Sequence, residues 1–169
     1  MTEKNDTKQL IDRLEATRNL SRDEWIRLIQ NRTADDADYL FERAQAVRTR
    51  HYGRSVYIRG LIEFTNYCKN DCFYCGIRKS NRNANRYRLT KEQILSCCEM
   101  GYALGFRTFV LQGGEDGSFT DDRLTDIISS IRTRWRACAI TLSVGERSYE
   151  SYKRLYDAGA NRFLLRHET

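Results

Sequence analysis

The sequence predicts an α/β fold with a parallel sheet, preceded by a helical extension. Two observations lead to this class. From residue 55 onward, apolar runs of strand length alternate with amphipathic helical stretches, which is the pattern of parallel strands joined by right-handed crossovers. Before that point the apolar residues recur at helical spacing, so helices are expected there.

The helical extension is expected to occupy residues 1–50. An apolar pattern at helical spacing starts at Leu10, and a second one follows Ser21 and Glu24, which have the spacing of a capping box. Thr33 is followed by two aspartates, an order that favours the start of a third helix. These helices carry no recognisable site, so we interpret them as an extension that packs on a larger unit.

Residues 51–169 are expected to form the α/β unit. Its strands are predicted at residues 55–65, 107–114, 139–145 and 161–169. Amphipathic helices are predicted between them, at residues 90–105, 119–135 and 148–159. The first of these helices begins with a capping box of Thr90 and Gln93, and the last ends at Gly159 in a C′ position. The residues expected on one face of the first helix are Ile94, Cys97, Cys98, Gly101, Tyr102 and Gly105.

Polar motifs follow the carboxyl end of every predicted strand. The segment YCKNDCFYCG, residues 67–76, follows the first strand, QGGE, residues 112–115, the second, and SVGE, residues 143–146, the third. The fourth strand ends in RHE, residues 166–168. Functional groups of parallel α/β folds gather at this edge of the sheet, so we expect one shared pocket there.

Three cysteines, Cys68, Cys72 and Cys75, lie within eight residues. Thiolates bind soft metals and iron–sulfur clusters. A structural zinc site usually takes four protein ligands, and neither His51 nor His167 lies at a typical ligand spacing. A cubane of four irons bound by three thiolates would instead keep one iron open for a substrate or cofactor. The other cysteines of the chain are expected to pack in the core.

The composition is that of a soluble globular protein, with 40% hydrophobic and 31% charged residues. No apolar run approaches the ~20 residues of a membrane helix, and the polar N-terminus is no secretory signal. We therefore expect a cytoplasmic protein without a membrane partner. The net charge of +6 includes a basic run, RKSNRNANRYR, that ends at Arg88. Most such runs are solvated loops, and a minority line phosphate or carboxylate sites.

The cysteine motif resembles that of a known enzyme superfamily. C-x3-C-x2-C with Tyr74 before the last cysteine, joined to GGE at residues 113–115, is similar to the signature of the radical S-adenosylmethionine (SAM) enzymes. The wider segments YCKNDCFYCGIR, FRTFVLQGGED and RFLLRHET resemble the biotin-synthase-like branch. Within that branch they are most similar to a maturase of the FeFe-hydrogenase H-cluster.

The resemblance implies a fold and two cofactors. Cys68, Cys72 and Cys75 would ligate a 4Fe–4S cluster, and its open iron would bind SAM, which such enzymes cleave to methionine and a 5′-deoxyadenosyl radical. The implied fold is a TIM-type (β/α) barrel, which needs about 250 residues. With four predicted strands, the chain is expected to be the N-terminal half of a radical-SAM barrel. Such a truncated chain would by itself be poorly soluble, or bind a cluster without completing turnover.

The residues implied around SAM come from all four strand ends. They are Tyr74, Gly113, Gly114, Glu115, Ser143, Arg166 and Glu168. Tyr74 would lie near the adenine, Glu168 near the ribose hydroxyls and Arg166 near a carboxylate. The GGE residues would lie near the methionine amino group, since glycines let a ligand approach the backbone and a carboxylate suits an ammonium.

The implied substrate is a small iron complex or another small molecule, and the implied partners are other hydrogenase maturases and an electron donor. Methylornithine synthase and biotin synthase are the alternatives within the same branch. An alternative from another class is a non-catalytic metal-binding module that contacts nucleic acid through Arg78 to Arg88. That interpretation leaves the GGE motif without a role, so nucleic acid is not the expected partner.

Overall fold

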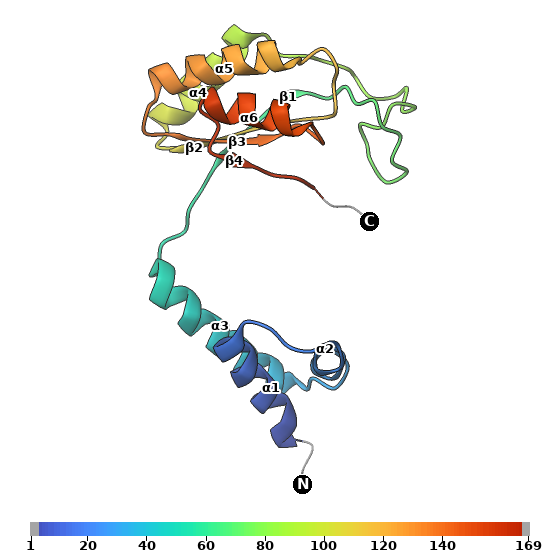
Figure 1. Cartoon of the computed structure of the whole chain (residues 1–169), viewed down its shortest axis with the longest axis vertical. Coiled ribbons are helices and arrows are strands. Elements are labelled where there is room, and N and C mark those ends of the chain that lie inside the picture. Colours follow the sequence, from blue (N-terminus) through green and yellow to red (C-terminus); the bar gives the residue numbers. More distant parts are fainter. Residues whose placement is uncertain (1–3, 167–169) are drawn as a thin grey trace. The chain divides into compact units, whose positions relative to one another are not determined.

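The computed structural model describes residues 4–166 of the chain. The chain divides into two compact units between Val56 and Tyr57. The first unit consists of helices, and the second contains a parallel sheet with its crossover helices (Figure 1).

The N-terminal unit consists of three helices, α1 (Lys4–Thr17), α2 (Arg22–Gln30) and α3 (Ala34–Tyr52). The predicted capping box is present, because the Ser21 side chain accepts from the backbone N–H of Glu24 and the Glu24 side chain accepts from that of Ser21. The buried apolar cluster of this unit consists of Leu10, Ile11, Leu20 and Leu28. In the described part of the chain, no helix has both the length and the apolar character that crossing a membrane requires.

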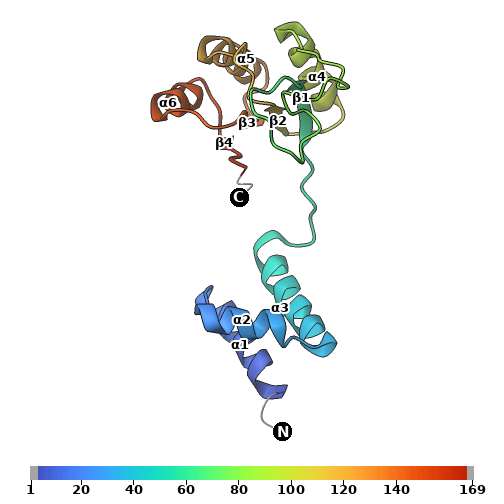
Figure 2. The same cartoon turned by 90° about the vertical axis from the view of Figure 1, so that its right-hand side faces the viewer.

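The C-terminal unit contains a four-stranded parallel sheet in the order β1-β2-β3-β4. The strands are β1 (Gly60–Thr65), β2 (Thr108–Gly113), β3 (Ala139–Ser143) and β4 (Arg162–Phe163). The crossover helices are α4 (Lys91–Ala103), α5 (Asp121–Arg134) and α6 (Tyr149–Asp157). They lie on one side of the sheet (Figure 2). This confirms the predicted α/β class, and helices on one side of a parallel sheet are the arrangement of part of a (β/α) barrel.

The core of this unit lies between the sheet and its helices. Alternate residues of each strand point into it, among them Phe64, Phe109 and Leu142, and α5 contributes Leu124 and Ile128. Each of these five side chains is at most 1% exposed. The sheet is therefore fixed against the helices, and its carboxyl edge is a firm base for the loops that follow the strands.

All four strands were predicted longer than they are, the first and the fourth by the most. The first strand begins at Gly60 and not at residue 55, because its partner β2 begins at Thr108 and pairs Phe109 with Gly60. The residues before Gly60 have no pairing with β2, and Val56 is 80% exposed. The fourth strand comprises Arg162–Phe163 where residues 161–169 were predicted, and residues 167–169 lie outside the described part of the chain.

The helix α4 buries a slightly different face from the predicted one. Ile94 and Cys98 are buried as expected, together with Leu95. Tyr102 and Gly105 are exposed although they were expected on that face. The helix ends before Gly105, which lies in the following turn with a φ of +94°.

The three cysteines outside the motif pack in the core. Cys98 is 0% exposed and Cys138 1% exposed, and the half-buried Cys97 packs against the same cluster. Burial raises the pKa of the Cys98 thiol to about 12 and raises the pKa of Cys138 as well. These thiols behave as small apolar side chains, as predicted.

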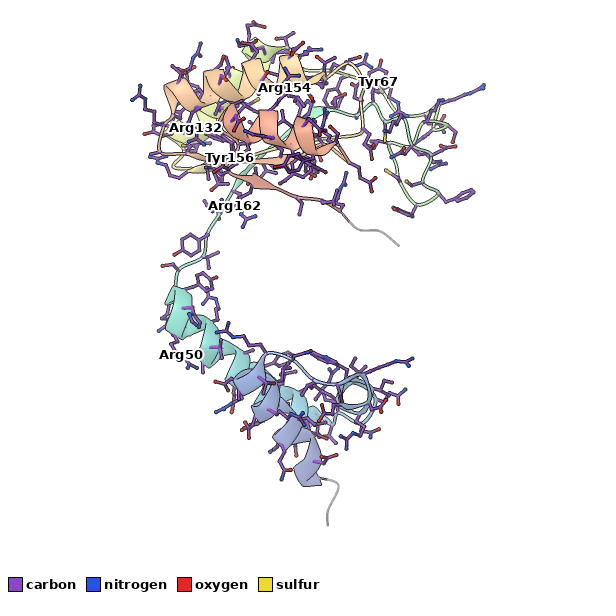
Figure 3. The ribbon with its side chains drawn as sticks, in the orientation of Figure 1. Arg50, Tyr67, Arg132, Arg154, Tyr156 and Arg162 are labelled. Atoms are coloured by element: carbon purple, nitrogen blue, oxygen red, sulfur yellow. The ribbon has the colours of Figure 1, made fainter. Side chains whose placement is uncertain are left out.

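An apolar pocket of about 380 Å³ lies beside the last strand. Its lining includes Leu142, Leu155, Tyr156, Phe163 and Leu165, and Figure 3 shows Tyr156 and Arg162 near one another there. In a complete (β/α) barrel a further strand and helix cover this edge.

Candidate functional site

A long loop leaves the carboxyl end of β1 and returns to the same strand. It carries Cys68, Cys72 and Cys75, and its return segment forms an antiparallel bridge between Arg88 and Thr65. The next backbone N–H, that of Leu89, donates to the carbonyl of Phe64 at 2.8 Å. Both ends of this cysteine loop, residues 66–89, are therefore anchored to β1.

Backbone hydrogen bonds shape the loop around the cysteines. The N–H of Cys75 donates to the carbonyl of Cys72 at 3.0 Å, and the N–H of Lys79 donates to the carbonyl of Asn70 at 2.9 Å. Cys72 is exposed, whereas Cys68 and Cys75 are half-buried, and all three thiols are free of disulfides. The loop therefore presents three available thiols on a backbone held by its own turns.

The basic run serves largely to hold this loop together. The guanidinium of Arg86 donates to the carbonyls of Ile77 at 2.9 Å, Arg78 at 2.7 Å and Asn81 at 3.2 Å, and also to that of Asn66. Four backbone carbonyls from both halves of the loop thus converge on one cation. This use of Arg86 does not favour the alternative in which the run contacts nucleic acid.

The glycines after β2 bring the second loop against the first cysteine. The N–H of Gly114 donates to the carbonyl of Thr65 at 3.3 Å. A Cβ placed on Gly114 would lie 2.2 Å from the carbonyl oxygen of Tyr67 and 2.8 Å from the Cβ of Cys68. Only glycine allows this close approach of two backbones, so the GGE motif and the cysteine motif form one surface.

Glu115 lies where three loops meet. Its Oε1 accepts from the Asn70 side chain at 2.9 Å, and its Oε2 lies 3.0 Å from the Nζ of Lys69. The backbone N–H of Lys69 also donates to the Glu115 carbonyl at 3.0 Å. From the β3 side, Gly145 has a φ of +79°, and a Cβ there would lie 2.1 Å from the Cγ of Glu115. Glycine at position 145 therefore leaves the space that the glutamate side chain fills.

Asp116 is a site residue that sequence reasoning missed. Its carboxylate accepts from the Arg88 guanidinium at 2.6 and 3.0 Å, from the Thr65 hydroxyl at 2.8 Å and from the N–H of Ser118 at 3.0 Å. Burial by itself would raise the pKa of Asp116, but the hydrogen bonds from Arg88, Ser118 and Thr65 outweigh it and lower the pKa to about 2. The acid after GGE was the available signal, but its partners were not predictable.

Arg88 also connects Asp116 to the residue before the first cysteine. The centre of its guanidinium lies 3.7 Å from the ring centroid of Tyr67, a cation–π contact. Tyr67, labelled in Figure 3, lies at the base of the cysteine loop, and its N–H donates to the Thr65 hydroxyl at 3.2 Å. Thr65, Tyr67, Arg88 and Asp116 therefore form a connected polar group beneath Cys68.

A row of polar residues lies on the sheet face opposite the helices. Strand register pairs Glu63 with Gln112 and Gln112 with Ser143, and the Gln112 amide donates to the Glu63 carboxylate at 3.0 Å. Ser143, predicted as a site residue, is 1% exposed. This row places Ser143 at the carboxyl edge, beside the GGE loop.

The other predicted site residues are Tyr74, Arg166 and Glu168. Tyr74 lies in the cysteine loop with 68% of its surface exposed. Arg166 is exposed and is the last described residue. Glu168 lies outside the described residues.

The donor set at this edge is compatible with a four-iron cluster. Within residues 4–166, no group of three or more His, Cys, Asp or Glu side chains gathers around one ion position. A four-iron cluster does not require its ligands to converge on one point, because each thiolate binds a different iron. The thiols of Cys68, Cys72 and Cys75 are free and at least partly exposed on one loop, and this arrangement fits such a cluster.

Comparison with known proteins identifies the family. Residues 62–169 match the profile of the Radical SAM superfamily. The FeFe hydrogenase maturase subunit HydE of Thermotoga maritima is 43% identical over 130 residues, which are 77% of this chain and 37% of HydE. The 3-methylornithine synthase of Methanosarcina acetivorans is 30% identical over 152 residues, 89% of this chain and 43% of the synthase. Biotin synthases also match.

A solved structure supports the same assignment. The crystal structure of HydG, a maturase of the FeFe-hydrogenase, superposes with a TM-score of 0.84 at 25% identity and covers 98% of this chain and 37% of HydG. The chain thus spans less than half the length of these three relatives. The matched region contains β1 from Ile62 onward, the other three strands and the three loops that meet at Glu115. By its sheet, its loops and its sequence, the chain belongs to the radical SAM superfamily, a family of enzymes that use a 4Fe–4S cluster and SAM.

Proposed function

We propose that this chain is the cofactor-binding half of a radical SAM enzyme, with a 4Fe–4S cluster held by Cys68, Cys72 and Cys75. The observation that carries this proposal is the close contact between the cysteine loop and the GGE loop. Gly114 lies against Cys68, and Glu115 binds the two residues that follow that cysteine. The residues proposed for the cluster and those proposed for SAM thus share one edge of the sheet.

The chain's own residues would position the ligand. When bound, the cluster would supply the electron that cleaves the sulfonium of SAM reductively. Glu115 would bind the methionine ammonium through its carboxylate. Gly113 and Gly114, which pack against Thr65 and Tyr67, would offer backbone groups to the ligand. The remaining proposed contacts of SAM are Tyr74, Ser143, Arg166 and Glu168. In this proposal residues 51–169 form the partial core and residues 1–50 a helical extension, in a cytoplasm that keeps thiols reduced.

We propose that the enzyme acts in the maturation of the FeFe-hydrogenase H-cluster. The identity of 43% to HydE, against 30% to the methylornithine synthase and 28% to a biotin synthase, supports this choice. The substrate would then be a small molecule or a small iron complex, with other hydrogenase maturases and an electron donor as partners. Biotin-type or methylornithine-type chemistry is the second candidate, supported by the matches to those enzymes.

Anaerobic iron–sulfur reconstitution followed by low-temperature EPR of the reduced protein tests the cofactor assignment. We expect a cubane signal that changes when SAM is added, because SAM would bind the open iron. Cys72→Ala should abolish the signal, whereas Cys98→Ala, which removes a core thiol, should retain it. A signal that is indifferent to SAM, or that survives Cys72→Ala, would contradict the proposal.

The proposed role in H-cluster maturation is tested separately, with a chain extended to the full length of its relatives. Such a chain should support H-cluster assembly when mixed with the other maturases, and should not convert lysine or dethiobiotin. Conversion of lysine or dethiobiotin would favour the second candidate and leave the cofactor assignment intact.

A further inference from the structure

We propose that Lys69 is a displaceable counter-ion, which occupies the ammonium position of Glu115 and thereby sets the affinity for ligands that carry an amino group. This inference rests on the proposed function, in which Glu115 binds the methionine ammonium of SAM. It adds a residue that determines affinity and is neither a metal ligand nor one of the proposed SAM contacts.

The two partners of this ion pair are held very differently. The Glu115 side chain is 22% exposed, is bonded to Asn70 at 2.9 Å and fills the space left by Gly145. The Lys69 side chain is 69% exposed. The backbone position of Lys69 is fixed independently by the hydrogen bond from its N–H to the Glu115 carbonyl. The ammonium of Lys69 can therefore leave while the carboxylate and the loop stay in place.

The ion pair borders a space that a ligand can enter. Lys69 and Glu115 both line a pocket of about 300 Å³ at the carboxyl ends of β2 and β3. Four acidic side chains line this pocket against two cationic ones, Lys69 and Arg147. An excess of acidic groups favours a cationic ligand. A ligand ammonium that reaches Oε2 of Glu115 meets the Lys69 ammonium already 3.0 Å from that oxygen.

Competition between the two ammonium groups follows from their shared partner. Two like charges cannot both lie close to one carboxylate oxygen without repulsion, so binding of the ligand releases Lys69 into solvent. Exposed ion pairs are individually weak, so removing the competitor should tighten binding by only about two- to five-fold. The effect should be confined to ligands that present an ammonium to Glu115.

The test measures dissociation constants of the anaerobically reconstituted protein by equilibrium dialysis. The probes are SAM, S-adenosylhomocysteine and 5′-methylthioadenosine, the last of which has no amino acid moiety. Lys69→Met should bind SAM and S-adenosylhomocysteine about two- to five-fold more tightly than the wild type, with 5′-methylthioadenosine unchanged. Lys69→Arg, which keeps the charge, should stay close to the wild type.

Two controls separate displacement from a general effect of charge. Lys79→Met removes the same charge from the same loop, and Lys79 is exposed and contacts Asn70 through its backbone; this variant should bind like the wild type. In a Glu115→Gln background the ammonium site is lost, so Lys69→Met should bring no further gain. This double-mutant cycle assigns the effect to the pair.

The outcomes distinguish the inference from the proposed function. If the wild type binds SAM and Lys69→Met brings no amino-specific gain, or if the gain persists with Glu115→Gln, the inference is wrong and the proposed function stands. If no variant binds SAM, the proposed function and this inference both fail. An equal gain from Lys79→Met would reduce the effect to general electrostatics and overturn the role of Lys69.

Discussion

Lys69 and Glu115 are joined twice, once through their backbones and once through their side chains. The N–H of Lys69 donates to the Glu115 carbonyl at 3.0 Å, and the Nζ of Lys69 lies 3.0 Å from Oε2 of Glu115. The backbone bond fixes the residue after Cys68 against the end of β2 whatever the side chains do. The carboxylate can therefore change partner while the cysteine loop keeps its place.

Gly114→Ala should disrupt the contact between the two loops. The added Cβ would lie 2.2 Å from the backbone oxygen of Tyr67, which cannot move without moving Cys68. We expect a loss of about 1–3 kcal/mol in the free energy of unfolding, and lower iron content after reconstitution. Urea denaturation of the apo protein and iron analysis check the two effects.

Gly117→Ala is the matched control for that substitution. A Cβ on Gly117 meets no atom within 4 Å, so stability and iron content should stay close to those of the wild type. Equal losses in both variants would mean that the close approach at Gly114 is not the cause.

Asp116→Asn should destabilise the chain much more than the loss of an exposed ion pair. The Asp116 side chain is 3% exposed and its partner Arg88 36% exposed, so the pair is only partly screened by solvent. We expect a loss of about 2–3 kcal/mol, below that of a fully buried pair. Asp122→Asn breaks the pair of Arg154 with an 85% exposed carboxylate and should cost less than about 1 kcal/mol. Urea denaturation at pH 7 compares the two, and similar losses would contradict a special role for Asp116.

The contribution of Asp116 should disappear in acid. Its pKa is lowered from 3.8 to about 2 in the folded chain, so the unfolded chain takes up the proton first as the pH falls. The stabilisation is therefore complete above about pH 5 and is lost between about pH 4 and pH 2. The difference in urea midpoint between the wild type and Asp116→Asn should be constant from pH 7 to 5 and shrink below pH 4. If the difference in urea midpoint grows on acidification, the pKa of Asp116 is raised in the folded chain and not lowered.

Alkylation should divide the six cysteines into two groups. Iodoacetamide at pH 8 should modify Cys72, which is exposed, well before Cys98, where burial raises the pKa to about 12 and leaves little thiolate to react. Mass spectrometry of the peptides reads each site. After reconstitution, Cys68, Cys72 and Cys75 should all become protected, and continued modification of any one of them would contradict the proposed ligand set.

Local structure was predictable wherever its signal lies within a few residues. The capping boxes at Ser21 and Thr90 are present as predicted, because the bonding groups are three residues apart and act within one turn. Gly159 follows the end of α6 with a φ of +119°, a conformation that glycine adopts without strain. The succession of strands and helices followed from the same kind of local periodicity.

Strand limits were less predictable, because a strand exists only where a partner pairs with it. The run that begins at residue 55 is apolar enough for a strand, yet pairing starts at Gly60 opposite Phe109. The fourth strand is likewise limited to Arg162–Phe163, which pair with Thr141 and Leu142. The hydrophobicity of a segment does not reveal where the adjacent strand begins or ends.

By itself the sequence determined which groups are candidates for the site, since the cysteine triplet and the GGE motif are contiguous and recognisable. Only the tertiary structure decided what holds them together. Asn70 and Glu115 are 45 positions apart, and Thr65 and Asp116 are 51 apart. These contacts depend on the register that sets Thr65 against Gly113, and no local pattern encodes the register of two strands joined through a helix.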